Sequence, residues 1–278
     1  MILSSIPSQT AERGRQIGCL SVAGLTLQVA PSYSPLMDRR KWMTISAGCF
    51  AALVCEHVEA SSVSSMLDVS VRDATDAFDH ILLGARDLDV GIRWVEERTG
   101  VRAKFGGNHP GAGTRNALLS LDTGHYLEII APDPAQANAP DLRKLRELSS
   151  PSIIQWAIHT EDIAPAKSMV EAAGIKTVGP QPGSRQRPDG KVLRWQKLEI
   201  EQTTPLVPFF IQWEAGSPHP SSDSPRLGTA KSLYFETPQP DELRRILHAA
   251  SVQADIRKSA VPRIALVVQT PKGEIEMS

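Results

Sequence analysis

Two residues whose side chains can do chemistry, His80 and Glu128, lie in one short run of the chain in which apolar segments alternate with turns. An imidazole nitrogen and a carboxylate oxygen can bind a divalent metal, and either group can also carry a proton during catalysis. His80 falls in the first predicted strand of this run and Glu128 in the last. We therefore expect both side chains to face one cleft, with Glu128 as the catalytic residue.

A second group of polar and aromatic residues has types suited to contact a ligand. Arg115 and Arg187 could each hold a carboxylate or phosphate through two parallel hydrogen bonds. Arg187 and its neighbour Arg185 lie in GSRQRPDG, which is rich in glycine and proline and is therefore predicted to be a loop. The alternative is that these loop arginines are solvated and that the tryptophans are core residues. The predicted substrate-binding residues are His109, Arg115, Asn116, Arg187 and Trp213.

The elements that would position these residues are a strand, a helix and three further strands. Asp79–Gly84 has the apolar run of a buried strand, and Asp87 and Gly100 are suited to begin and end a helix. The turn Asp122-Thr123-Gly124 would join the last two strands as a hairpin. The three strands after the helix are predicted at Val101–Phe105, Thr114–Leu121 and His125–Ile130.

The same βαβββ order recurs twice, with a period of roughly 75 residues that is longer than the repeats of solenoid proteins. The second unit has its helix at Glu161–Ala173, and its strands are predicted at Ile153–Thr160, Ile175–Gly179, Lys191–Ile200 and Leu206–Glu214. The third, partial unit has its helix at Pro240–Ala250, and its strands are predicted at Ser232–Thr237, Val252–Ile256, Arg263–Thr270 and Glu274–Met277. The pattern indicates a few paired modules.

This repeat, with a histidine on its first strand and a glutamate on its last, resembles the vicinal oxygen chelate superfamily, which includes glyoxalase I and extradiol dioxygenases. The segments DHILLG, HPGAGTRNALL, YLEIIAPDP, GSRQRPDG and PFFIQWE with a following HPS are similar to its glyoxalase-like domain subfamily. The resemblance covers about residues 77–278. It implies an α+β fold in which repeated βαβββ modules form an open, curved mixed sheet around a cleft.

The resemblance also implies where a metal would bind, because each module of the superfamily offers a ligand on its first and last strands. Matching the second unit to the first places Gln155 opposite His80 and Gln212 opposite Glu128. The implied metal ligands are thus His80, Glu128, Gln155 and Gln212. With two strong donors instead of the usual three, the set would bind a metal weakly, and it would suit Mn²⁺, Mg²⁺, Ni²⁺ or Fe²⁺ better than tetrahedral Zn²⁺.

Composition sets further bounds on function. Hydrophobic residues make up 41% of the 278-residue chain, which is ample for a core, and the net charge of −1 gives no electrostatic footprint for nucleic acid. No window reaches the ~20 apolar residues of a membrane span. There is no P-loop, no nucleophile elbow and no dinucleotide-binding glycine motif. The expected partner is a small molecule, and a homodimer is compatible with the sequence.

Residues 1–77 differ from the rest and are interpreted as an N-terminal extension, followed by the paired domain at 78–214 and the partial module at 228–278. Within the extension, residues 37–60 resemble a twin-arginine export signal: Arg39, Arg40 and Lys41 precede an apolar stretch from Trp42 to Cys55. Export to the periplasm is therefore expected. The alternative is a short hydrophobic helix that caps the domain of a cytoplasmic protein.

Two classes of function remain open on sequence grounds. One is a small-molecule enzyme, namely a metal-assisted lyase, isomerase or dioxygenase acting on a small oxygenated substrate, in which Glu128 is ligand or base and His80 a ligand. The other is a non-catalytic module that binds or sequesters a small molecule in the same cleft. The pair of His80 and Glu128 favours the enzyme, whereas the two neutral glutamines favour the binding module.

Overall fold

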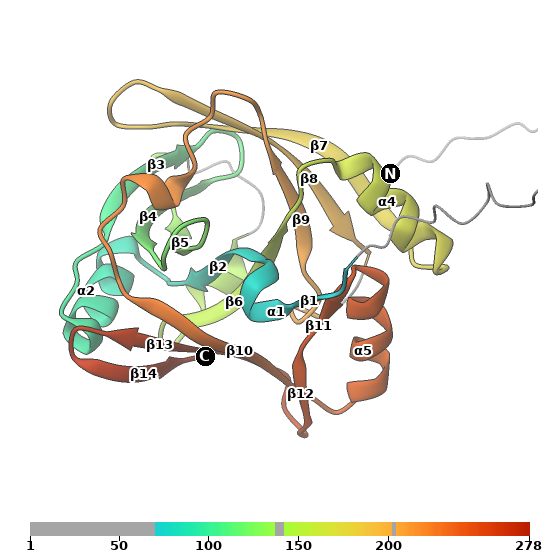
Figure 1. Cartoon of the computed structure of the whole chain (residues 1–278). Helices are drawn as coiled ribbons and strands as arrows, with labels where there is room; N and C mark the ends of the chain where they lie inside the picture. Colours follow the sequence, from blue (N-terminus) through green and yellow to red (C-terminus); the bar gives the residue numbers. More distant parts are fainter. Residues whose placement is uncertain (1–69, 137–141, 202–203) are drawn as a thin grey trace, which may run out of the picture. The chain divides into compact units, whose positions relative to one another are not determined.

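The computed structural model of the chain describes residues 70–136, 142–201 and 204–278 (Figure 1). The predicted export signal at 37–60, and all of the extension before residue 70, lie outside the described residues. The last part of the extension, residues 70–77, forms β1 (Arg72–Asp73) and the short helix α1 (Ala74–Ala77). β1 pairs in parallel with β11 (Val252–Gln253).

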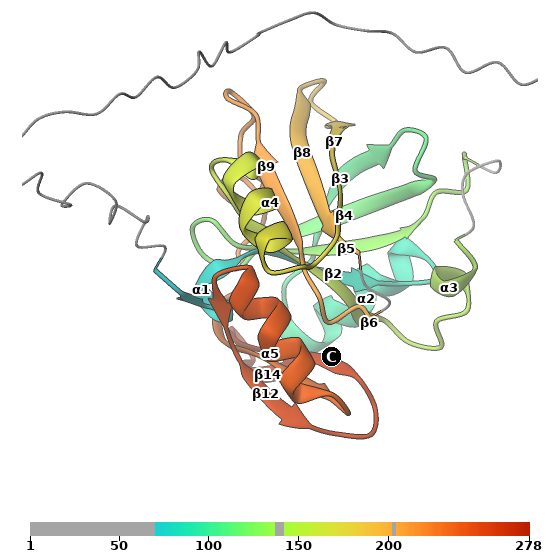
Figure 2. The ribbon, with the colours of Figure 1, turned by 90° about the vertical axis from the view of Figure 1, so that its right-hand side faces the viewer.

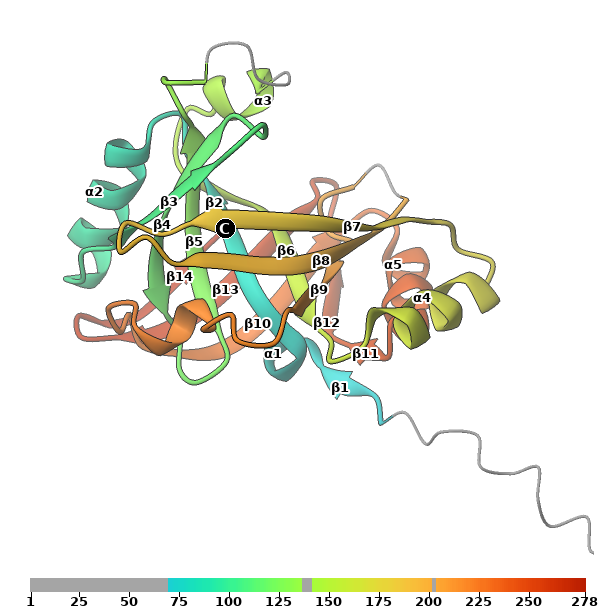
Figure 3. The same ribbon diagram turned by 90° about the horizontal axis from the view of Figure 1, so that it is seen from above.

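Eight strands form a closed barrel in the order β2-β5-β4-β3-β7-β8-β9-β6. The resemblance implied an open sheet, and the difference comes from β3 and β7, which meet at a single residue pair, Asn108 with Gln186. From above, β7 and β8 run crosswise to β4 and β5 (Figure 3). The strands are β2 (Phe78–Gly84), β3 (Lys104–His109), β4 (Thr114–Ser120), β5 (Tyr126–Pro132), β6 (Ser152–His159), β7 (Thr177–Gln186), β8 (Val192–Ile200) and β9 (Phe209–Trp213).

Alternation along the barrel strands sends one set of side chains to the core and the other to a cavity inside the barrel. On β2, Ile81 and Leu83 are fully buried, whereas His80 and Leu82 line the cavity inside the barrel. Glu128 on β5 likewise lines the cavity between two fully buried neighbours. Successive side chains of a strand point to opposite faces, so one face builds the core and the other the cavity.

Two helices cover the outer face of the barrel. Helix α2 (Leu88–Thr99) packs on β5 and β4, and α4 (Ile163–Ala172) packs on β8, β7 and β9 (Figure 1). Asp87 accepts hydrogen bonds from the first turn of α2, and Gly100 ends that helix in the left-handed conformation with φ 78°, as the sequence predicted. Asp162 caps α4 in the same way.

The C-terminal residues form a second sheet of order β12-β10-β13-β14, which lies beside the barrel with α5 (Pro240–Ala249) (Figure 2). Phe235 of this sheet packs on Trp156 of β6 with ring centroids 5.1 Å apart, and both rings are fully buried. The two sheets therefore share one core. The remaining elements are α3 (Arg143–Arg146), η1 (Pro220–Ser222), β10 (Thr229–Thr237), β12 (Asp255–Lys258), β13 (Arg263–Thr270) and β14 (Gly273–Met277).

The predicted α+β class, with repeated βαβββ modules curved around a cleft, is confirmed by this topology. Within the part of the chain that the structure describes, no helix is both long and apolar enough to cross a membrane.

Candidate functional site

The barrel encloses a cavity of about 980 Å³, which is lined by residues from all eight of its strands and from the loop before β9. One end of the cavity carries polar groups, and the rest of its wall is largely apolar. The polar lining includes His80, His109, Asn116, Glu128 and Arg185. Apolar and aromatic lining comes from Leu82, Ile130, Ile153, Trp195, Phe209 and Trp213.

His80 and Glu128 face one another in this cavity. The Nε2 atom of His80 lies 3.6 Å from Oε2 of Glu128, and both residues are buried. The His80 ring stacks on Tyr126 with centroids 4.6 Å apart and meets Phe209 edge-on at 5.5 Å. The two groups that the sequence placed on the first and last strands of the first module are thus brought together with a fixed ring orientation.

The other oxygen of Glu128 is held by Asn116, its diagonal neighbour on β4. Asn116 Nδ2 donates to Glu128 Oε1 over 2.8 Å, and the same amide lies 3.2 Å from His109 Nε2. His109 Nδ1 lies 2.8 Å from the Thr114 hydroxyl. An amide N–H can only donate, so His109 Nε2 accepts and its Nδ1 carries the hydrogen. Burial lowers the pKa of His109, which agrees with a neutral ring.

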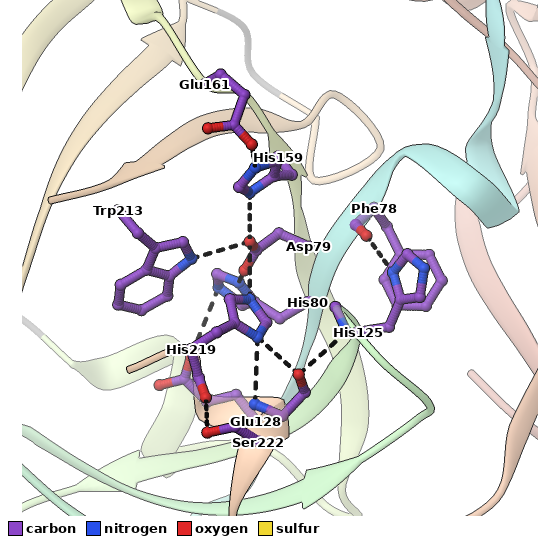
Figure 4. A network of polar contacts seen from close by, with 12 residues as sticks. Phe78, Asp79, His80, His125, Glu128, His159, Glu161, Trp213, His219 and Ser222 are labelled. Carbon is purple, nitrogen blue, oxygen red and sulfur yellow. Dashed lines mark hydrogen bonds and ion pairs between the residues drawn. The ribbon is translucent and has the colours of Figure 1, made fainter. Parts of the chain in front are cut away.

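Behind His80 lies Asp79, a fully buried carboxylate that the sequence did not single out (Figure 4). An ionised carboxylate can only accept, so every ring nitrogen that faces it carries a hydrogen. His80 Nδ1 is therefore protonated, and in the neutral ring the lone pair sits on Nε2, toward Glu128. The donors to Asp79 are His80 Nδ1 at 2.7 Å, Trp213 Nε1 at 3.0 Å, His159 Nδ1 at 3.2 Å and His219 Nε2 at 3.2 Å.

A bulge in β2 explains how adjacent residues reach the same cluster. The pairing with β6 shifts between Phe78 and His80, which stand opposite the consecutive residues Ile158 and Ala157 and leave Asp79 as the extra residue. A bulge re-aims side chains that alternation would send to opposite faces. No local sequence pattern predicts this bulge. Of the partners of Asp79, His219 lies in the HPS segment that follows PFFIQWE.

Burial would raise the pKa of Asp79, but hydrogen bonds from His159, His219 and His80 outweigh it and hold the pKa well below 3.8. The reciprocal effect is seen at His159. The hydrogen bond with Asp79 raises the pKa of His159 above 6.5 against partial burial, and Glu161, which faces its Nε2 at 2.9 Å, adds to the rise. His159 therefore favours the doubly protonated, charged ring.

This pairing predicts a pH dependence of stability. A raised pKa in the folded protein stabilises it fully below the unfolded value of about 6.5 and loses that contribution as the pH rises through the folded value. We therefore expect wild type to have a higher melting temperature than His159→Gln at pH 5.5, and we expect the difference to shrink by pH 8.5. Thermal denaturation in matched buffers measures it.

A matched control is His248→Gln, because His248 is exposed on α5. Its melting temperature should follow that of wild type at both pH values. A His159→Gln deficit that is equal at pH 5.5 and pH 8.5 would contradict the assigned charge on His159.

The predicted four-ligand metal set is not assembled. Gln155 lines the cavity, but its Nε2 donates to the carbonyl of Val207 over 3.2 Å. Gln212 turns outward, and its Oε1 accepts from Ile163 N at the start of α4 over 3.0 Å. Gln212 lies between Ile211 and Trp213, which both line the cavity, so alternation sends it to the helix. Its place in the predicted set is wrong.

Three further predicted residues have clear positions. Trp213 lines the cavity, whereas Arg115 points away from it toward the N-terminus of α2, with Nη2 3.7 Å from Asp87 Oδ2. Arg115 is next to the inward-facing Asn116, so the two cannot share a face. Arg187 lies beyond the end of β7 and forms ion pairs with Asp223 and Asp189. Neither of the two arginines predicted near the mouth of the site lines the cavity.

Arg185 occupies the cavity instead. GSRQRPDG was predicted to be a loop, but its first four residues belong to the long strand β7, on which Arg185 faces inward. The side chain is buried, and burial lowers the pKa of Arg185. A guanidinium nevertheless stays charged in proteins. The cavity therefore contains a positive group that was not among the predicted substrate-binding residues.

Comparison with known proteins supports the fold. Residues 78–251, more than half of the chain, match the family model of the glyoxalase-like domain. A hypothetical protein from Staphylococcus aureus has a similar structure with a TM-score of 0.55 at 16% identity, covering 72% of this chain and 98% of that one. Methylmalonyl-CoA epimerase from Mycobacterium tuberculosis is more distant, with a TM-score of 0.38 at 20% identity, covering 54% of this chain and 93% of that one.

None of the curated proteins matches the sequence. The two similar structures are too different in sequence to show more than a fold, so neither carries an activity over to this chain. The family match is of a different kind, because it covers both βαβββ modules and every residue that lines the cavity. The chain belongs to the glyoxalase-like domain family of the vicinal oxygen chelate superfamily.

Proposed function

We propose that the protein is an enzyme that moves a proton at a carbon next to a carbonyl group of a small oxygenated substrate, as an isomerase or a lyase does. The observation that carries the proposal is the buried pair of Glu128 and His80 at the polar end of the cavity, 3.6 Å apart. Two buried proton-carrying groups fixed side by side at the wall of a cavity are what such a reaction requires.

The electrostatics favour Glu128 as the base. Burial opposes its charged form, but the Asn116 hydrogen bond and the charge of Arg185, together with His80 when its ring is protonated, lower the pKa of Glu128 below 4.5. Glu128 is thus ionised at neutral pH. Asn116 holds one of its oxygens, and the other is directed toward His80, so a carbon acid that enters the cavity beside this pair would meet a fixed carboxylate oxygen.

The proposed step conserves atoms and electrons. Glu128 takes a proton from the carbon and an O–H bond forms on the carboxylate, the C–H electron pair becomes the C=C bond of an enolate, and the C=O π pair moves onto the carbonyl oxygen. His80, whose Nδ1 is tied to Asp79, can exchange a proton through Nε2. Return of the proton to the substrate at a second position completes an isomerisation, and loss of a leaving group from the enolate completes an elimination.

A divalent metal is common in the superfamily, but the residues at this site do not fit the predicted set. Gln212 is turned outward, and Asn116 hydrogen-bonds both Glu128 Oε1 and His109 Nε2, so of the predicted four ligands only His80, Glu128 and Gln155 line the cavity. No group of three or more His, Cys, Asp or Glu side chains in the described ranges is arranged to hold a metal ion. In the proposed step, the proton is therefore carried by Glu128 and His80.

Solvent exchange tests the proposal directly, because it detects the proton transfer itself and does not require the product to be identified. The purified protein is incubated in D₂O with a panel of carbonyl compounds that carry an acidic C–H bond, and deuterium uptake is followed by NMR and mass spectrometry. Catalysed exchange into one class is expected, and EDTA should leave it unchanged. Binding without exchange would instead assign a non-catalytic binding module. If elemental analysis finds one metal ion per wild-type chain and none in His80→Gln, the proposal that the reaction needs no metal would be overturned.

A further inference from the structure

Arg185 is a buried charge that the fold itself leaves unused. Its side chain is only 4% exposed, and within the described residues it takes part in no hydrogen bond and no ion pair. Its Nη1 atom is buried without a partner. A buried guanidinium without a partner opposes folding, because its hydration is lost and nothing replaces it. An unused charge in a ligand cavity is therefore best explained by a partner that arrives with the ligand.

The adjacent strand β3 has two glycines, Gly106 and Gly107, that leave room for the Arg185 side chain. A Cβ atom on Gly106 would lie 2.6 Å from Arg185 Nη1 and 2.4 Å from Asn116 Oδ1, and a Cβ on Gly107 would lie 3.2 Å from Arg185 Cγ. Side chains at these two positions of β3 would therefore displace the guanidinium. Asn116 Oδ1 is itself a buried acceptor without a donor. Both orphaned atoms lie beside Gly106, next to the catalytic end of the cavity.

The charge of Arg185 is not neutralised by the cavity either. Glu128 is the carboxylate that acts on it most strongly, but the two do not form an ion pair and Glu128 is already held by Asn116. The other carboxylate in the lining, Glu199, has Oε1 2.5 Å from Lys197 Nζ. The guanidinium thus keeps its donors for an oxyanion, which it can bind through two parallel hydrogen bonds.

The rest of the cavity indicates what the oxyanion is attached to. The volume of about 980 Å³ is large for a site that would hold only a small polar acid. Its lining is more apolar than polar: beside the charged Lys144, Lys197 and Glu199 it includes Leu82, Ile154, Leu148, Trp195 and Phe209. A ligand that fills this space has a charged head and an extended apolar body.

We propose that Arg185 is the anion anchor of this cavity and that the ligand is a carboxylic acid with an extended apolar body. The inference rests on the proposed function in that it concerns the same cavity, and it names the class of substrate on which Glu128 and His80 act. The shared chemistry of the head group is that of an oxyanion, so a phosphate monoester is the competing source of the same charge.

Equilibrium binding to the full chain tests the anchor separately from turnover. Isothermal titration calorimetry is performed with octanoate, octyl phosphate and the neutral 1-octanol. Octanoate is expected to bind wild type at least tenfold more tightly than either 1-octanol or octyl phosphate. Arg185→Gln should weaken octanoate at least tenfold and leave 1-octanol unchanged, with Arg185→Lys in between. Arg187→Gln is the matched control outside the cavity and should bind octanoate as wild type does.

Three results would overturn the anchor: no binding of octanoate to wild type, equal affinity for octanoate and 1-octanol, or undiminished octanoate binding to Arg185→Gln. Tighter binding of octyl phosphate would overturn the carboxylate. The melting temperature of Arg185→Gln should not fall, because an unpaired buried charge is removed, and a clear fall would show a structural role instead. Glu128→Gln should still bind octanoate, so loss of exchange in that variant leaves the anchor standing.

Discussion

Glu128→Gln is expected to lower the rate of substrate deuterium exchange by about 10²–10⁴-fold, the usual contribution of a general base. Glutamine keeps the size of the side chain and can still contact Asn116, but it cannot accept a proton from carbon. The affinity for the substrate should change little, so the loss should appear in kcat and not in KM. Exchange rates measured by NMR at saturating substrate give the comparison.

Glu199→Gln provides the matched control, because Glu199 is another carboxylate of the cavity wall and pairs with Lys197. It should retain most of the exchange rate. Equal losses in the two variants would mean that the charge of the cavity, and not a base at Glu128, supports the reaction. Full activity of Glu128→Gln would leave His80 as the only base in the proposed pair.

Trp156→Ala is expected to destabilise the protein by about 3–5 kcal/mol, the usual cost of removing a large aromatic side chain from a core. Trp156 is fully buried, its Nε1 donates to Leu206 O over 2.8 Å, and its ring packs on Phe235 of the C-terminal sheet. The substitution therefore removes a hydrogen bond, opens a cavity and weakens the contact between the two sheets. Urea denaturation followed by circular dichroism measures the change.

Val261→Ala is the control for that measurement, since Val261 is 69% exposed and its truncation should change the free energy of unfolding by no more than about 0.5 kcal/mol. Wild type should unfold in one transition because the barrel and the C-terminal sheet share a core. Two separate transitions in wild type, or a Trp156→Ala effect as small as that of Val261→Ala, would contradict the shared core.

The fold could be predicted from the sequence because its signals are local. The apolar run at Ile81–Leu83, the cap at Asp87 and the left-handed Gly100 each depend on a few neighbouring residues, and each appears in the structure. The strand β7 was predicted too short because Gly183 and Pro182 normally indicate a turn. Here both residues pair with β8, and such pairing between distant segments cannot be read from a local sequence pattern.

The site was predicted only in part, since its geometry depends on which face each strand presents. His80 and Glu128 are brought together, but Arg115 and Gln212 are each one residue from an inward-facing neighbour and therefore point outward. Arg187 was predicted to bind substrate and Arg185 was not, because the sequence does not show that β7 extends to Gln186 and so includes Arg185. Asp79 could not be found at all, because the bulge that turns it toward His80 is set by the register with β6.

The single pair between Asn108 and Gln186 that closes the barrel has a consequence for which part of the cavity can change. Glu128, His80 and Asp79 lie on β5 and β2, which are paired over several residues. Arg185 is next to Gln186, which forms the single pair between β7 and β3. A shift between β3 and β7 would break one residue pair, whereas a shift between β2 and β5 would break several. Substitutions in β3 and β7 are therefore expected to change the space beside Arg185 while β2 and β5 keep the register that brings His80 to Glu128.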